Sequence, residues 1–86
     1  MYTIRFANDA IDDLRRLDKA TATRIIRKIN WLAENADNVV PKGLRKEYAG
    51  LAKIRERDYL IIYQLLQNEE VLVVHVVGHR RDVYDR

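Results

Sequence analysis

The sequence predicts one α+β domain over residues 1–86, with a helical hairpin packed on one face of a mainly antiparallel sheet. Three observations predict this class. Apolar residues recur at helical spacing over residues 8–35, and they alternate or run together as in strands over residues 51–77. An 86-residue chain is also too short to bury two separate cores. We therefore expect the order β-α-α-β-β-β followed by a short C-terminal tail.

A short strand and a helix are predicted first. Residues 2–6 alternate apolar and polar, which directs Ile4 and Phe6 toward a core. Asn8 and Asp9 then offer a helix N-cap. The charged residues that follow are Asp12, Asp13, Arg15 and Arg16. Acids precede bases, as the helix macrodipole favours, so we interpret the acids as macrodipole partners and not as catalytic carboxylates.

The second predicted helix begins at Asp18 or Thr21 and runs antiparallel to the first. Its apolar face is formed by Ala22, Ile25, Ile26, Ile29, Leu32 and Ala33. Its opposite face is formed by Arg24, Arg27 and Lys28. We expect this basic face to be solvated, with contact to phosphates as the alternative. We expect Trp31 to pack in the core or between helix and sheet.

Three strands are predicted after a connector over residues 35–43, which contains the only proline. They span residues 51–57, 59–66 and 71–77. Asp58 fits a tight turn between the first two, and the nearly continuous apolar run of the second is typical of a central strand. We expect Tyr59 to pack in the core and His75 to be a packed or sheet-face histidine. Local pattern does not decide where residues 2–6 join this sheet.

Composition excludes several function classes. The chain has no cysteine, which removes disulfide scaffolds, thiolate zinc sites, iron–sulfur clusters and cysteine nucleophiles. It has two histidines, too few to suggest a structural metal site. Its start has no apolar signal region, and no apolar run approaches the length of a membrane span. We expect a cytoplasmic domain without cofactor, metal or membrane partner.

Charge is concentrated, although the net charge is only +3. Residues 42–57 hold six cations and two acids, so this window carries +4 and the remainder of the chain is slightly acidic. A period of two places Lys53, Arg55 and Arg57 on one face of the strand and Ala52 and Ile54 on the other. If the apolar pair faces the helices, the cations line the open face, where arginine and lysine can bind phosphate.

Three segments together resemble the RelE branch of the RelE/ParE toxin superfamily. They are Gly-Leu-Ala-Lys-Ile-Arg at 50–55, Tyr-Leu-Ile-Ile-Tyr at 59–63 and Val-Gly-His-Arg-Arg-Asp-Val-Tyr at 77–84. The resemblance covers essentially the whole chain, and its most specific part is the C-terminal segment. It implies the toxin of a type II toxin–antitoxin pair, an endoribonuclease that cleaves translated mRNA in the ribosomal decoding site without a metal. It also implies a neutralising antitoxin and operator DNA bound only through the toxin–antitoxin complex.

The resemblance also assigns roles to residues. Lys53 matches a lysine implicated in proton abstraction, Arg55 a second strand cation, Arg80 an arginine that serves the leaving group or transition state, and Tyr84 a tyrosine that stacks on or orients the nucleotide. His79 replaces a lysine of some members, and we hypothesise that it shares the acid–base work. The expected RNA- or phosphate-binding residues are Arg45, Lys46, Arg57 and Arg81.

One departure from the family pattern leaves other functions open. The position that usually carries a phosphate-contacting arginine is Leu60, and Arg57 across the turn is the candidate substitute. The alternatives are a ParE-like poison of DNA gyrase without RNase activity, and a catalytically degenerate module that binds an antitoxin and corepresses its operon. All three share the expected fold, so architecture does not separate them.

Overall fold

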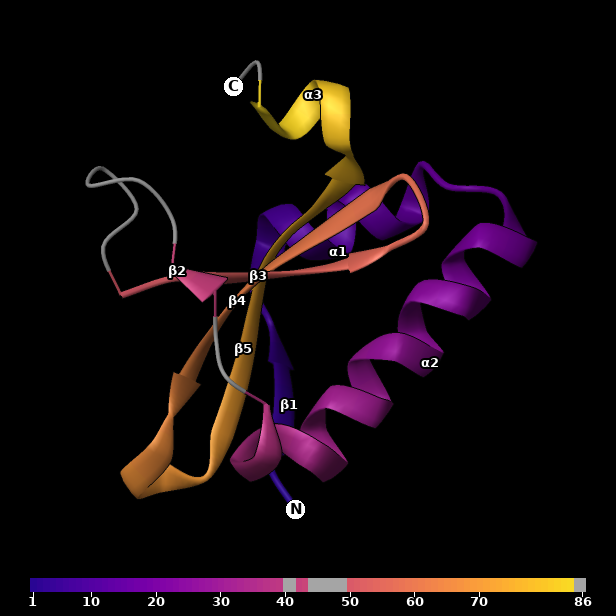
Figure 1. Cartoon of the computed structure of the whole chain (residues 1–86). Coiled ribbons are helices and arrows are strands. Elements are labelled where there is room, and N and C mark those ends of the chain that lie inside the picture. Colours follow the sequence, from indigo (N-terminus) through magenta and orange to yellow (C-terminus); the bar gives the residue numbers. More distant parts are fainter. Residues whose placement is uncertain (40–41, 44–49, 85–86) are drawn as a thin grey trace.

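The computed structural model describes residues 1–39, 42–43 and 50–84 (Figure 1). Its elements are β1 (Thr3–Phe6), α1 (Asn8–Arg15), α2 (Lys19–Asn35), η1 (Ala36–Asn38), β2 (Lys42–Gly43), β3 (Ala52–Glu56), β4 (Tyr59–Leu66), η3 (Gln67–Glu69), β5 (Val71–His79) and α3 (Arg80–Tyr84). The predicted α+β fold class is confirmed, and the expected C-terminal tail begins as a short helix. The predicted connector over residues 35–43 differs from the prediction, because its end forms β2, which pairs with β3. No helix of the described ranges is long and apolar enough to cross a membrane.

The strands form one five-stranded sheet in the order β1-β5-β4-β3-β2. β3, β4 and β5 form the expected antiparallel meander. The N-terminal strand, whose place local pattern left open, runs parallel to β5 at the sheet edge and pairs Thr3 with Val71 and Phe6 with Val74. Because β1 ends opposite Val74, the second half of β5 (His75–His79) has no strand neighbour on that side within the described residues.

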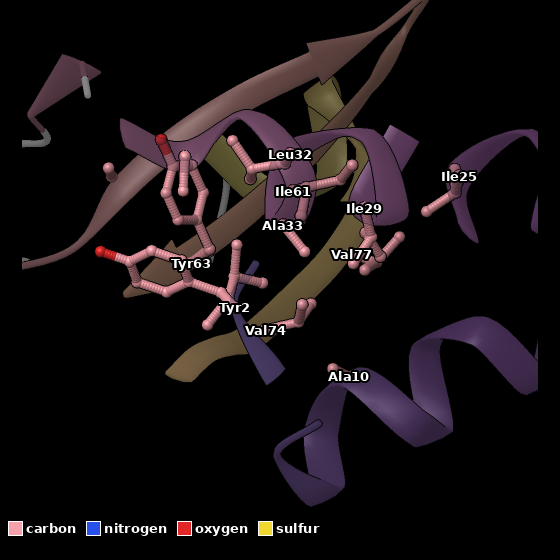
Figure 2. Packing of buried hydrophobic residues seen from close by; sticks show 13 residues of the cluster. Tyr2, Ala10, Ile25, Ile29, Leu32, Ala33, Ile61, Tyr63, Val74 and Val77 are labelled. Carbon is pink, nitrogen blue, oxygen red and sulfur yellow. The ribbon is translucent and has the colours of Figure 1, made fainter. Parts of the chain in front are cut away.

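Both α1 and α2 cover the same face of the sheet, and the hydrophobic core lies between them and the strands (Figure 2). The largest fully buried side chains are Ile25, Ile29, Leu32, Ile61, Tyr63, Leu72, Val74 and Val77. Ile4 and Phe6 pack against this cluster, as predicted, and so does Tyr59. The other face of the sheet is partly open, which places the candidate site there.

Two predictions for α2 are wrong. Ile26 is 38% exposed and Trp31 is 45% exposed, although both were expected to be buried. The buried stripe follows Ile25, Ile29 and Leu32, and each residue step turns a helix by about 100°. Ile26 and Trp31, one position after and one position before members of that stripe, therefore lie on its two flanks.

Helix capping follows the prediction for α2 and departs from it for α1. Asp18 caps α2, because its carboxylate accepts a hydrogen bond from the Thr21 N–H at 3.4 Å. Hydrogen bonding to the Thr21 side chain, and then to its backbone N–H, lowers the pKa of Asp18. The N-cap of α1 is Ala7, without a side-chain hydrogen bond, so Asn8 and Asp9 are already helical. Ala7 donates its N–H to the Val74 carbonyl at 2.9 Å, and this bond continues the pairing of β1 with β5 up to the helix.

The interpretation of Asp13 as a macrodipole partner is corrected by its burial. Asp13 is 6% exposed, and its carboxylate accepts a hydrogen bond from the Val77 N–H at 3.0 Å. Arg16 lies at 3.6 Å from the other carboxylate oxygen. The second half of β5 lacks a strand partner on this side, so α1 supplies an acceptor from a side chain instead. Asp13 therefore joins α1 to β5.

Replacing Asp13 with alanine is expected to lower the free energy of unfolding by about 1–3 kcal/mol, because the Val77 N–H would remain buried without an acceptor. The measurement is the midpoint of urea denaturation, followed by circular dichroism. The matched control is Asp12→Ala, an exposed acid on the same helix, with an effect within about 0.5 kcal/mol. Equal midpoints for the two variants would show that the buried hydrogen bond contributes nothing.

The hydroxyl group of Tyr63 is buried without a hydrogen-bond partner among the described residues, and burial raises the pKa of Tyr63. Tyr63→Phe is therefore expected to stabilise the fold by about 1 kcal/mol at neutral pH. The unfolded chain ionises near pH 10 and the folded chain only at higher pH, so tyrosine burial costs stability as pH rises above 10. The variant should lose less stability than the wild type between pH 9 and pH 11 in thermal denaturation. An equal loss would contradict this assignment.

The comparison variant for this experiment is Tyr2→Phe. The Tyr2 hydroxyl donates to Asp37 at 3.3 Å, and its pKa is raised by burial and by the Asp37 carboxylate. Removing this hydroxyl loses a hydrogen bond, so Tyr2→Phe is not expected to stabilise the protein at neutral pH.

Candidate functional site

The two faces of β3 differ in chemistry as predicted. Ala52 is buried in the core and Ile54 packs against it, beneath the helices. Lys53 and Arg55 alternate with them and therefore point to the open face. Arg55 is exposed and Lys53 is half-buried. Lys53 and Arg55 therefore form a cationic stripe on the open face of β3.

Apolar side chains lie beside these cations on the open face. In the sheet register Lys53 pairs with Ile62, and Arg55 pairs with Leu60, which in turn pairs with Gly78 of β5. Leu60 and Ile62 are buried although they lie on the face opposite the helical hairpin. The two cations therefore border an apolar floor formed by Leu60 and Ile62.

The C-terminal helix α3 folds onto this floor. A Cβ atom added at Gly78 would lie 3.0 Å from a methyl carbon of Val83, so α3 approaches the strand at its one glycine. The Arg80 N–H at the start of α3 donates to the Asp58 carbonyl at 2.8 Å. This close approach brings the first residue of α3 to the end of the β3–β4 hairpin.

The β3–β4 turn also holds Arg55. The Arg55 guanidinium lies at 3.8 Å from the Asp58 carboxylate, and its Nε donates to the Arg57 carbonyl. One two-residue turn therefore contacts both Arg55 and Arg80, which are 25 positions apart in the sequence. Sequence reasoning assigned Asp58 only turn propensity, and no local signal indicates that its carbonyl meets Arg80.

Arg57 does not lie on the cationic stripe, which corrects the prediction. It occupies the turn with a φ of 55°, and its guanidinium lies at 3.9 Å from the Glu56 carboxylate. Glu56 is on the helix side of the sheet, and both residues line a cavity against α2. The left-handed backbone at Arg57 breaks the strand period, so the side chain turns away from Leu60 and does not replace the missing arginine there.

His79 is also on the other face from Lys53. It pairs with Tyr59 in the sheet, and the two rings make an edge-to-face contact with centroids 5.6 Å apart. Its Nδ1 accepts a hydrogen bond from the Arg81 N–H at 3.2 Å. This places His79 as the N-cap of α3, where it holds the helix that begins with Arg80.

The other predicted residues lie in α3, on β5 or outside the described part of the chain. Arg81 is exposed in the first turn of α3. Tyr84 ends α3, but its side chain lies outside the part of the chain that the structure describes, as do Arg45 and Lys46. His75 is half-buried, and its Nε2 lies 3.3 Å from the Gln64 side-chain oxygen, which confirms a sheet-face histidine.

A family model described as the ParE toxin of the type II toxin–antitoxin system parDE matches residues 4–84. The chain belongs to this toxin family. The match extends from β1 to the end of α3, so both the cationic face and the helix that folds onto it lie within the family domain.

Relatives of this ParE-family toxin carry RelE-type names. The toxin RelG of Mycobacterium tuberculosis is 29% identical over 85 residues, covering 99% of this chain and 98% of the relative. The toxin–antitoxin complex RelBE2 of the same organism matches with 29% identity and a TM-score of 0.81, covering 92% of this chain and 98% of that chain. The isolated RelE toxin of Escherichia coli shares the fold, with a TM-score of 0.77 at 24% identity, covering 99% and 93% of the two chains. The protein is therefore a toxin of the RelE/ParE type, with the expected α+β fold.

Proposed function

We propose that this toxin is an endoribonuclease that cleaves translated mRNA on the ribosome and so inhibits translation and growth. The observation that carries the proposal is that Lys53 and Arg55 share the open face of the sheet, and that Asp58 contacts both the Arg55 guanidinium and the backbone N–H of Arg80. The RelE-type relatives support it. The two cations Lys53 and Arg55 on one accessible face suit a reaction in which negative charge grows on a phosphate.

In the proposed reaction the 2′-hydroxyl of the mRNA attacks the adjacent phosphorus, and the bond to the 5′-oxygen of the next nucleotide breaks. Lys53, as the neutral amine, accepts the 2′-hydroxyl proton. Arg55 and Arg80 bind the phosphate oxygens as the pentavalent transition state forms. Arg80 stabilises the negative charge on the leaving 5′-oxygen, and water supplies the proton that this oxygen takes up. Protonated Lys53 returns its proton to the solvent, and the products are a 2′,3′-cyclic phosphate and a 5′-hydroxyl. Tyr84 is proposed to orient the nucleotide by stacking.

The comparisons support one of the proposed partners, the antitoxin. Structures of RelBE complexes contain a toxin with its antitoxin, and we propose a cognate antitoxin for this chain as well. Ribosome and mRNA are the proposed targets, which places the protein in the cytoplasm. Operator DNA is proposed to bind only through the toxin–antitoxin complex.

Primer-extension mapping of mRNA tests this function. A defined mRNA is incubated with the purified toxin, with and without ribosomes stalled at a known codon. We expect new 5′ ends at the codon in the ribosomal A site only in the presence of ribosomes. Intact mRNA in both reactions, at a toxin concentration that arrests growth in cells, would overturn the proposal.

A ParE-like poison of DNA gyrase is the second candidate. The matching family model describes the ParE toxin, and the buried Leu60 removes a cation from the proposed cleavage face. A supercoiling assay with purified gyrase separates the two functions. Inhibited supercoiling with intact mRNA would favour the second candidate.

The position of His79 predicts that it supports cleavage indirectly, by capping α3 and so holding Arg80 in place. Its Nδ1 accepts the Arg81 N–H only when unprotonated, and it lies on the face away from Lys53. We expect His79→Asn, which keeps a capping acceptor, to retain most of the cleavage rate, whereas His79→Ala loses about tenfold because α3 and Arg80 become less ordered. Single-turnover cleavage rates check this. A loss in His79→Asn equal to that in His79→Ala would favour direct acid–base work by the imidazole.

A further inference from the structure

A stripe of basic and aromatic side chains lies on α2, away from the cleavage face. Its members are Arg24, Arg27, Lys28 and Trp31. Their spacing of i, i+3, i+4 and i+7 places them on one side of the helix. Together with Glu56 of β3 they line an open cavity of about 320 Å³. The stripe therefore faces a hollow between α2 and the neighbouring strand.

A second cavity of about 210 Å³ continues this hollow toward the β3–β4 turn. It is lined by Thr21, Arg24, Ile25, Glu56, Arg57, Asp58 and Tyr59. Arg24 and Glu56 line both cavities, so the two form one surface, which we name the α2 groove. Figure 1 shows the N-terminal end of α2 near the tip of the β3–β4 hairpin.

The groove is positively charged and available for contact. Four cations and two acids line it, and the acids have partners of their own: Glu56 lies near Arg57 and Asp58 near Arg55. Arg27 has no hydrogen-bond or ion-pair partner among the residues that the structure describes. The surplus positive charge is therefore on α2 itself.

Trp31 gives the groove an aromatic platform. Its side chain is 45% exposed, which is unusual for the largest apolar residue, and the Lys28 ammonium lies 4.7 Å from the ring centroid. An exposed aromatic ring beside a row of cations is the combination that binds single-stranded nucleic acid, since bases stack on the ring and phosphates meet the cations. An acidic peptide would also contact the cations, but its carboxylates would not stack on the Trp31 ring.

We propose that the α2 groove is a second contact surface for single-stranded RNA, with Arg24, Arg27 and Lys28 on phosphates and Trp31 stacked on a base. Tyr59 is in the core-packed layer of β4, and Lys53 and Arg55 point to the opposite side of the sheet. The groove is therefore separate from the proposed cleavage face. The choice of RNA as the polyanion rests on the proposed function.

Trp31 makes the proposal directly measurable, because it is the only tryptophan in the chain. The full-length Lys53→Ala variant is titrated with a 12-nucleotide oligoadenylate, and tryptophan fluorescence is recorded. Stacking of a base is expected to quench the emission and to weaken with salt, with a slope of about −0.7 for each phosphate contacted.

Two double variants that each remove two positive charges serve as test and control. Arg24→Gln with Arg27→Gln is expected to weaken RNA binding by about tenfold and to reduce the salt slope by about 1.4. Arg15→Gln with Lys19→Gln removes two exposed cations that do not line the groove, and is expected to leave affinity within about twofold. Denaturation midpoints verify that both variants fold.

The outcomes separate this proposal from others. Unquenched Trp31 while a fluorescently labelled oligoadenylate binds would overturn it, because RNA would then bind elsewhere. Stronger salt-dependent quenching by a polyglutamate peptide than by RNA would also overturn it in favour of an acidic protein segment. A third outcome is possible: RNA quenches Trp31, the Arg24→Gln/Arg27→Gln variant weakens this quenching, and the toxin with Lys53 intact fails to cleave mRNA on ribosomes. This outcome would support RNA binding in the α2 groove and overturn the proposed function.

Discussion

Lys53→Ala is expected to lower the rate of mRNA cleavage on the ribosome by about 10²–10⁴-fold, the range for loss of a general base. Lys53 is half-buried on the open face, next to the apolar floor that Leu60 and Ile62 form on the adjacent strand β4. Its removal leaves the phosphate-binding arginines but no amine to take the 2′-hydroxyl proton. The measurement is the single-turnover rate on stalled ribosomes, together with growth after induction.

A charge-preserving variant separates the base from the electrostatic contribution. Lys53→Arg keeps the positive charge, but a guanidinium does not release its proton in proteins, so the cleavage rate is expected to remain low. Lys19→Ala is the matched control, since Lys19 is an exposed lysine at the start of α2. Full activity in Lys53→Arg would show that Lys53 contributes charge alone, and full activity in Lys53→Ala would remove it from the site.

The second large effect is expected at Gly78, where α3 meets the sheet. A Cβ atom at this position would already lie 3.0 Å from a Val83 methyl carbon. Gly78→Val adds two methyl groups beyond that atom, on the side where α3 approaches the strand. We expect α3 to shift by an ångström or more and cleavage to fall by about 10²-fold, because Arg80 would be misplaced. β-branched residues suit a strand, so the sheet itself should persist.

A compensating substitution makes this prediction specific. Val83→Ala removes the methyl groups that oppose the new side chain, so the Gly78→Val/Val83→Ala double variant is expected to recover at least part of the lost rate. Gly78→Ala should have the milder effect, since a flexible side-chain end can yield by a few tenths of an ångström. Cleavage at the wild-type rate by Gly78→Val would show that the position of α3 does not control the site.

Much of the fold was predictable because its signals are local. The observed meander was predicted from three local patterns: the alternation over Ala52–Glu56, the turn residue Asp58 and the apolar run of β4. The cap at Asp18 marked the start of α2. Each of these signals depends on neighbours within a few positions, so no knowledge of the tertiary structure is needed to read them.

The residues that were misplaced depend on contacts made far along the chain. Trp31 lies on the flank of a helix whose buried stripe is set by the strands beneath it, and Asp13 is buried because β1 ends before the second half of β5. His79 faces Tyr59 because of the β4–β5 register, and a one-residue shift would turn it to the other face.

A helical hairpin over an antiparallel meander, with Lys53 and Arg55 on one face of β3, was predictable from local sequence patterns. Three features depend on contacts between distant segments: β1 joins β5 in parallel, Arg57 leaves the cationic face, and Asp58 contacts both Arg55 and Arg80. The two sets differ in the range of the interactions that determine them. Side-chain periodicity is set by backbone geometry over two to four residues, whereas strand partners, register and the docking of α3 are set by packing between segments distant in the chain.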